Sequence, residues 1–375
     1  MGDLSHPHDS QEALGLPSLA TGGSAAILPW VTVVVTVYNY ERYITKCLDS
    51  IATQDYPRFQ CIIVDDVSTD NSAVRIKSFI EDRGLADRFR LVCHETNQGQ
   101  LGAFRTGLAH AAGEFVAFVD ADDLWQADFL SRHIEAHLSF QPVAFTSSDQ
   151  YQINENDELI AGLHTDHKAQ GDFVIVKPFQ IYTNWWVWGT TSTMVFRRAV
   201  LEVIMPLNTA PFRRCADNYI CHFAHLLGSS LLIPKRLGFY RRHGENLFSG
   251  NRIIGGNIQP TGNMAFHPSH ESVRTTVRDV LQANLAQFQG LLGRTELARS
   301  LAMTMTLPET FLLVSQWLAG KKWKGADSKL IMTLLVRNLV YRVRWQAFRW
   351  LLLRSSPKIT VEKYTSPSNA QKAKR

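Results

Sequence analysis

The chain has 375 residues, of which 45% are hydrophobic and 19% charged; this composition is ordinary for a folded globular protein and excludes a fibrous or wholly disordered one. Its five cysteines are widely scattered and form no CxxC pair, so the sequence predicts reduced, mostly buried thiols and favours a cytoplasmic protein. The formal net charge of +5 is uneven: from Arg337 onward there are ten basic residues and one acidic residue, and the mildly acidic remainder argues against a nucleic-acid groove.

Residues 1–29 are rich in Gly, Ser, Pro and His and show no hydrophobic periodicity, which predicts a disordered N-terminal segment. The chain begins without a basic and then apolar leader, so we expect no signal peptide. It also lacks an uncharged apolar run of about eighteen residues, so we expect no membrane span.

Between Trp30 and Asp123, apolar runs alternate with amphipathic stretches and are joined by short polar loops. Alternation of strand and helix patterns predicts a mostly parallel α/β sheet flanked by helices. No GxGxxG follows the first apolar run and no GxxxxGK[ST] occurs in the chain. The sequence therefore supports neither a dinucleotide site of the usual kind nor a P-loop.

Three carboxylates, Asp120, Asp122 and Asp123, directly follow the apolar run Phe115–Val119. At the end of a buried strand such groups repel one another and lose solvation, so they need a compensating cation. An Asp-x-Asp with no Cys and no nearby His suits Mg²⁺ or Mn²⁺ that bridges substrate phosphates. The alternative interpretation is that an Asp here caps the helix that follows.

Four short motifs at predicted strand ends resemble those of the family 2 glycosyltransferases. In chain order, the motifs are Thr36–Asn39, Val64–Asp70, Asn97–Gly99 and Gly113–Asp123. Each motif alone is weak, but four in this order are specific. The resemblance covers about residues 30–250 and implies a catalytic domain of the Rossmann-like GT-A fold that uses a sugar nucleotide.

The resemblance implies a role for each matching polar residue. Thr36 and Tyr38 would line the nucleotide pocket, with the tyrosine ring against the base. Asp66 would accept a hydrogen bond from the ring N–H of the base. Asp122 would bind Mg²⁺ or Mn²⁺ on the diphosphate, and Asp120 would lie beside the ribose and the metal. A planar ring and an accepting carboxylate are suited to recognise a uracil-like base.

The sequence also departs from the family pattern at two positions. Val67 stands where relatives usually have Gly, so we expect a different turn there. Arg105 is kept, but Thr106 replaces the Asn that usually follows it. We expect Arg105 to meet a phosphate or Asp120.

The second half of the domain carries the predicted catalytic base. The segment Arg213–Tyr219 resembles the family's Glu-Asp segment, with Ala216 in place of the Glu and Asp217 retained. The resemblance implies that Asp217 is the general base of an inverting transfer; the alternative is a helix cap. The segment Trp185–Trp188 could stack on acceptor sugars or fill the core.

The segment Tyr240–Asn246 resembles the family's Tyr-Arg-x-His sequence. His243 is therefore a candidate for a further contact to the metal or the diphosphate, although a lone His is as often structural. Arg241 or Arg242 would neutralise phosphate.

After the catalytic domain we predict a linker or flap over residues 251–270, a helical region over 271–356 and a basic tail over 357–375. Between residues 336 and 352 two apolar stripes on different helix faces are separated by arginines. This pattern favours a helix lying on the inner, anionic face of the cell membrane. The alternative is a helix buried on both sides, in the protein or a dimer.

The sequence thus predicts an inverting, metal-dependent glycosyltransferase that moves a sugar from a nucleotide-diphosphate sugar, expected to be UDP-linked, to a hydroxyl of a cell-surface glycan or glycolipid. A second hypothesis is a non-catalytic carbohydrate-binding or scaffolding protein on the same fold. A third, a nucleotidyltransferase, would need a Gly-rich phosphate loop, which Tyr38–Glu41 does not supply.

Overall fold

The computed structural model describes residues 28–140, 142–162, 169, 171–177, 186–243 and 268–305, with six single residues between 308 and 340. It divides into two compact units, Met1–Gln259 with Phe266–Thr304 and Pro260–Ala265 with Met305–Arg375. Nearly all of the described residues belong to the first unit, and the description below is of that unit alone.

The first half of the unit alternates strands and helices. Its elements are β1 (Val31–Val37), α1 (Ile44–Ala52), β2 (Phe59–Asp65), α2 (Ser72–Asp82), β3 (Phe89–Cys93), α3 (Gly99–Ala109) and β4 (Phe115–Asp120). The four strands are parallel and lie in the order β3-β2-β1-β4. The predicted parallel α/β arrangement is confirmed here.

The second half adds strands of both directions. Its elements are β5 (Leu124–Trp125), α4 (Phe129–Ser139), β6 (Phe145–Asn154), β7 (Leu159–Ala161), β8 (Val174–Val176), η2 (Thr191–Thr193), β9 (Met194–Arg197), α5 (Arg198–Ile204), η3 (Ala210–Phe212), α6 (Ala216–Leu227) and β10 (Ser230–Arg242). Strand β9 joins β4 to β6 and is antiparallel to both. Strand β10 runs parallel to β6 and carries β5 and β8 at its sides.

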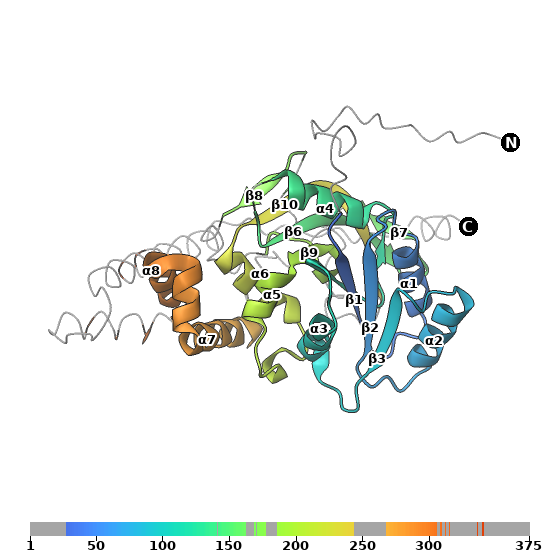
Figure 1. The fold of residues 1–375 in the computed structure, drawn as a ribbon, viewed down its shortest axis with the longest axis horizontal. Coiled ribbons are helices and arrows are strands. Elements are labelled where there is room, and N and C mark those ends of the chain that lie inside the picture. The colour runs from blue at the N-terminus through green and yellow to red at the C-terminus, as the bar shows by residue number, and fades with distance from the viewer. Residues whose placement is uncertain are drawn as a thin grey trace, which may run out of the picture. The chain divides into compact units, whose positions relative to one another are not determined.

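Helices cover both faces of this sheet because its central strands are apolar on both faces. In β1, Val33 and Val35 pack toward α1, α2 and α4, while Val34 packs toward α3, α5 and α6. Figure 1 shows α1 and α2 on one side of β1–β3 and α3, α5 and α6 on the other. A Cβ at Gly107 would clash with the side chain of Val34, so this glycine lets α3 lie close against β1.

Two further helices follow, α7 (Pro268–Ala283) and α8 (Leu285–Thr304). Phe288 of α8 stacks on Phe223 of α6, with ring centroids 5.9 Å apart, so this helical extension shares the core of the unit. The predicted basic tail, almost all of the predicted disordered segment and flap, and the membrane-docking stretch beyond Val340 lie outside the described residues. In the part of the chain that the structure describes, no helix is long and apolar enough to cross a membrane.

Candidate functional site

Three parallel strands end side by side at the edge of the sheet where the predicted site residues gather. In the strand register, Val37 of β1 pairs with Asp65 of β2, and Thr36 pairs with Asp120 of β4. Asp66 is fixed at the same edge, since its N–H donates to the carbonyl of Val37 at 2.9 Å. Ligands of open α/β sheets bind beyond the carboxyl ends of the strands, so this edge is the candidate site.

Asp66 is buried and both of its carboxylate oxygens have partners. One oxygen accepts from the N–H of Gln98 at 2.7 Å, and the other accepts from the N–H of Gly99, also at 2.7 Å. Asp66 therefore caps the N-terminus of α3 from another strand, where a negative charge is favoured by the helix dipole. A carboxylate has about four lone-pair directions, so acceptor capacity is left for a ligand.

His94 and Thr106 form a chain of contacts that begins at Asp66. His94 Nδ1 lies 2.7 Å from Asp66 Oδ1, and His94 Nε2 lies 2.8 Å from the hydroxyl of Thr106. Because an ionised carboxylate only accepts, the Nδ1–H of His94 donates to Asp66, and Nε2 of the same ring is in contact with the hydroxyl of Thr106. Thr106, which stands where relatives have Asn, thus has a defined place in this chain of contacts.

The loops after β1 and β2 are joined by hydrogen bonds beside Asp66. Asn39 donates its N–H to Ser68 Oγ at 2.9 Å and accepts from the N–H of Thr69 at 2.7 Å. Both Asn39 and Val67 adopt left-handed backbone conformations, with φ of 62° and 68°. Val67 therefore takes the backbone region that a glycine would favour at this position, at a cost of about 1–2 kcal/mol. Tyr38, the predicted base-stacking residue, is half exposed at the rim.

Asp120 is partly buried where β4 ends. Its Oδ1 accepts from the hydroxyl of Thr36 at 3.2 Å and from Nε2 of Gln100 at 3.1 Å. Burial, and next the charges of Asp122 and Asp217, raise the pKa of Asp120 to about 7. Gln100 also accepts from the N–H of Ala216, which directly precedes Asp217, so the predicted base lies close to Asp120.

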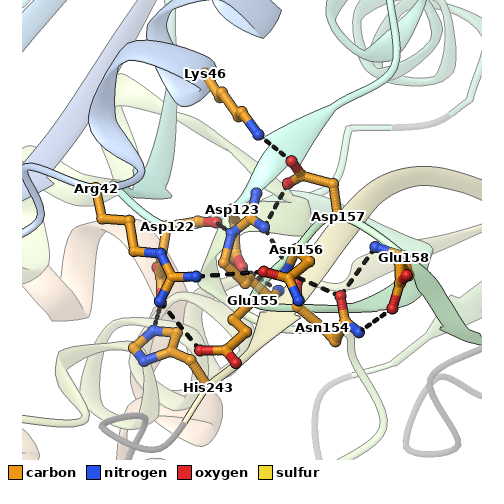
Figure 2. A network of polar contacts seen from close by, with 11 residues as sticks. Arg42, Lys46, Asp122, Asp123, Asn154, Glu155, Asn156, Asp157, Glu158 and His243 are labelled. Carbon is orange, nitrogen blue, oxygen red and sulfur yellow. Dashed lines mark hydrogen bonds and ion pairs between the residues drawn. The ribbon is translucent and has the colours of Figure 1, made fainter.

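Asp122 and His243 form a buried pair. Oδ2 of Asp122 lies 2.9 Å from Nε2 of His243 (Figure 2). The ring of His243 stacks on Tyr43 at a centroid distance of 5.1 Å. The neighbouring Asp123 is turned into the protein, because its Oδ1 accepts from the N–H of Arg241 at 2.9 Å. Burial, together with Asp122 and Asp120, raises the pKa of Asp123 well above its usual value.

The Asp122–His243 pair fits a divalent cation. Carboxylate oxygen and imidazole nitrogen are accepted ligands of Mn²⁺, and the crowded carboxylates at this strand end would be stabilised by a positive charge. Within the described ranges, no group of three or more His, Cys, Asp or Glu side chains is arranged to hold a metal. A bound ion would therefore take its other ligands from substrate phosphates and water, which is how Mg²⁺ is commonly held.

Asp217 lies in the first turn of α6, and its Oδ1 accepts from the N–H of Asn218 at 2.8 Å. The helix begins after Cys215, whose φ of 56° is left-handed and whose side chain makes no capping hydrogen bond. The N–H of Ala216 instead donates to Oε1 of Gln100 at 2.9 Å. Asp217 therefore lies at the start of a helix, and Gln100 connects that helix start to Asp120.

The structure gives the predicted phosphate-binding arginines different surroundings. Nη1 of Arg105 donates to the carbonyl of Leu207 at 2.6 Å, and it is Gln100 that reaches Asp120. Arg241 is fully buried, donates Nε to the carbonyl of Asp122 at 2.7 Å and forms an ion pair with Asp157. A fully buried guanidinium with these partners supports the segment that carries Asp122. Of the two arginines, Arg242 therefore stays the one predicted to neutralise phosphate.

The tryptophan-rich segment was predicted either to stack on acceptor sugars or to fill the core, and its residues differ in burial. Trp188 is fully buried and donates Nε1 to Ser230 Oγ at 2.9 Å, so it belongs to the core. Trp186 is half buried and packs edge-on against Trp188. Trp185 lies outside the described residues.

The sequence analysis did not predict the supporting contacts of Gln100, His94 or Ser192. Ser192 Oγ accepts from the N–H of Asp120 at 3.1 Å, and its carbonyl accepts from Nε1 of Trp125 at 2.6 Å. The one available signal was the position of Gln100 next to the Asn-Gln-Gly motif; the others depend on long-range contacts that periodicity does not specify.

Comparison with known proteins identifies a family. A model of glycosyl transferase family 2 matches residues 32–204, which include Asp66 and Asp122 but end before Asp217 and His243. An uncharacterized glycosyltransferase of Nostoc sp. is 33% identical over 216 residues, which cover 58% of this chain and 66% of that protein.

A second relative is the Escherichia coli UDP-Glc:alpha-D-GlcNAc-diphosphoundecaprenol beta-1,3-glucosyltransferase, 31% identical over 130 residues, 35% of this chain and 49% of that protein. The match thus spans less than two thirds of either relative. Among solved structures, Staphylococcus aureus TarS 1–349 with UDP-GlcNAc aligns with a TM-score of 0.49 and 18% identity, covering 86% of this chain and 92% of that one. The matching family model, the relatives and the α/β fold with its strand-end motifs agree, and the chain belongs to the family 2 glycosyltransferases of GT-A fold.

Proposed function

We propose that this chain is an inverting glycosyltransferase that moves a sugar from a nucleotide-diphosphate sugar to a hydroxyl group of a lipid-linked or cell-surface glycan. The observation that carries the proposal is the convergence of three carboxylates from different elements. Asp66 follows β2, Asp120 closes β4, and Asp217 lies in the first turn of α6, whose start is linked to Asp120 through the side chain of Gln100. Nucleotide recognition, charge compensation and proton removal would therefore occur around one strand edge.

The donor side of the site is suited to a nucleotide. Asp66 would accept from the N–H of a uracil-like base with the lone pairs that its protein partners leave free, and Tyr38 would stack on the base. Asp122, with His243, would hold Mg²⁺ or Mn²⁺. When bound, the cation would stabilise negative charge on the departing diphosphate.

Asp217 is proposed as the general base of the transfer. Its carboxylate would take the proton from the acceptor hydroxyl as that oxygen attacks the anomeric carbon. The bond from the anomeric carbon to the diphosphate oxygen breaks on the opposite face, and its electron pair leaves with the nucleotide. One carboxylate is sufficient for this displacement, which inverts the anomeric centre.

The relatives support the choice of donor and acceptor class. The Escherichia coli relative is named for a UDP-glucose donor and a diphosphoundecaprenol-linked acceptor. On this basis we propose a UDP-linked donor and a glycolipid acceptor for this chain. The proposed metal dependence rests instead on Asp122 and His243.

A thermal-shift comparison of UDP-, GDP- and dTDP-sugars, each with and without Mn²⁺, tests the donor assignment. A ligand at a hundred times its Kd stabilises the folded state by about 2.7 kcal/mol, which a melting curve resolves. We expect a UDP-sugar with Mn²⁺ to give the largest shift, and the Asp66→Asn variant to lose it. Stabilisation without any release of UDP in the presence of glycolipid acceptors would favour the non-catalytic alternative.

A further inference from the structure

The side chain of Gln100 is bound at both of its ends. Its Nε2 donates to Oδ1 of Asp120 at 3.1 Å, and its Oε1 accepts from the N–H of Ala216 at 2.9 Å. Because a carboxylate only accepts and a backbone N–H only donates, one orientation of the amide satisfies both contacts. Gln100 therefore spans the distance between the end of β4 and the start of α6.

Helix α6 depends on this contact at its first turn. The first N–H groups of a helix have no partner within it and need acceptors from elsewhere. The residue before the helix, Cys215, is left-handed and provides no side-chain cap. Gln100 supplies the missing acceptor for Ala216, which directly precedes Asp217.

The backbones around Gln100 and α6 are also in direct contact. The N–H of Gln100 donates to the carbonyl of Arg213 at 3.0 Å, and Nη1 of Arg213 donates to the carbonyl of Asn97 at 3.0 Å. A Cβ at Gly99 would clash with the Cα and side chain of Arg213, so a larger residue would push the two segments apart. The N–H of Gly99 also donates to Asp66, so the segment from Asn97 to Gln100 is connected to the residue proposed to bind the nucleotide base.

We propose that Gln100 is a positioning residue that fixes the proposed base Asp217 relative to Asp120. This inference rests on the proposed function, in which Asp217 removes the acceptor proton. Both ends of the Gln100 side chain are bound to the protein, so its proposed role is exerted through the start of α6. Its loss should therefore lower kcat while the donor-binding contacts of Asp66 and Asp122 remain.

The test compares Gln100→Met with Gln60→Met in the full-length protein. Gln60 is a matched control, because its Nε2 also makes two hydrogen bonds, to Thr32 Oγ1 at 3.1 Å and to the carbonyl of His110 at 3.2 Å, away from the site. Displacing a reacting group by about 1 Å can cost about a hundredfold in rate. For Gln100→Met we expect kcat to fall by about ten- to a hundredfold with the donor KM within about threefold of the parent. For Gln60→Met we expect parental kcat and KM.

Amide hydrogen exchange provides a measurement that is independent of activity. Without an acceptor, the N–H of Ala216 should exchange at least about tenfold faster in Gln100→Met, while Gln60→Met leaves that rate unchanged. Parental kcat and parental exchange at Ala216 in Gln100→Met would overturn the inference. An equal fall of kcat in both variants would overturn it too, because that result indicates a general loss of stability.

A third variant covers the case in which Gln100→Met does not fold. Gln100→Glu keeps an acceptor for Ala216 but places a carboxylate against Asp120, so we expect parental exchange at Ala216 and a raised donor KM. A parental donor KM would contradict the contact with Asp120. If the parent transfers no sugar and Asp217→Asn changes nothing, the proposed function itself fails. If the parent is active, Asp217→Asn is inactive and Gln100→Met is unaffected, only the role of Gln100 is disproved.

Discussion

The two halves of the catalytic unit are built on different interiors. Strand β1 reads VTVVVTV and is buried along its whole length, like most of β2 and β4. Strand β6 reads FTSSDQYQIN, and its Thr146, Ser147, Ser148, Gln150 and Gln152 are all buried. The first half is therefore stabilised mainly by burial of apolar side chains, and the second depends more on side-chain hydrogen bonds.

This difference determines how each half holds its functional residues. Asp66 and Asp120 follow ladders of parallel strands, so the backbone register alone brings them to one edge. The positions of Asp217 and His243 instead involve side-chain contacts between elements, with Gln100 at the start of α6 and with Asp122 respectively. Substitutions should thus separate donor binding in the first half from transfer in the second.

The largest expected effect is that of Asp122→Asn, which removes the proposed metal ligand at the junction of the two halves. We expect sugar transfer to be abolished, a greater loss than for any other variant discussed here. The folded state should not be destabilised, because Asp122 is one of the charges that raise the pKa of Asp120 and of Asp123. Transfer rates at increasing Mn²⁺, together with a melting curve, test this. Parental activity with parental Mn²⁺ dependence would refute the metal assignment.

Asp217→Asn should lose sugar transfer but keep the binding of the donor nucleotide and the metal. We expect transfer to fall by at least about a hundredfold, the usual scale of general-base catalysis, with UDP and Mn²⁺ binding retained. Asp128→Asn is a matched control, since Asp128 precedes α4 and pairs with Arg132 near the surface at 3.2 Å. If Asp217→Asn loses UDP affinity in proportion to its activity, the residue is structural rather than a base.

The regular half could be predicted from the sequence, and the second half only in outline. Continuous apolar runs predicted β1, β2 and β4, and the polar residues directly after them predicted the site edge, because parallel strands end at a common edge. The burial of Arg241 and the placement of Arg105 on Leu207 could not be predicted. Both depend on which distant carbonyl a long, flexible side chain reaches, and hydrophobic periodicity carries no information on that choice. The roles proposed for Asp66, Asp122, Asp217 and His243 remain predictions.

A stability measurement on the first half tests whether its loops, too, need specific side chains. Asn39 is left-handed and accepts from the N–H of Thr69 at 2.7 Å. Asn39→Ala loses the hydrogen bond and strains the backbone, so we expect the free energy of unfolding to fall by about 2 kcal/mol. Asn39→Gly loses the hydrogen bond but tolerates the left-handed backbone, so its loss should be smaller. Urea unfolding of both variants measures the difference, and equal losses would show that backbone strain is unimportant here.

The smallest expected effect is a pH dependence that belongs to the second half. Burial lowers the pKa of His137, a residue of α4 that contacts β9, from its ordinary 6.5 to about 3. The unfolded chain therefore binds this proton more readily, so stability is complete above about pH 7 and falls as the pH drops below about 6.5. Between pH 7 and pH 6 the loss from one such histidine is about 0.7 kcal/mol. Asp120, with its pKa raised to about 7, changes stability in the opposite direction over this range.

The effect of His137 is therefore measured as a difference between the parent and His137→Gln. The glutamine can still donate to the carbonyl of Val195, which His137 Nε2 contacts at 3.0 Å, but it cannot bind the proton. Contributions from Asp120 are common to both proteins and cancel in the comparison. We expect the parent to lose about 0.7 kcal/mol more than the variant between pH 7 and pH 6. Parallel pH profiles of the parent and the variant would mean that His137 has the same pKa in the folded and the unfolded chain. Burial in the second half would then not disfavour its charged form.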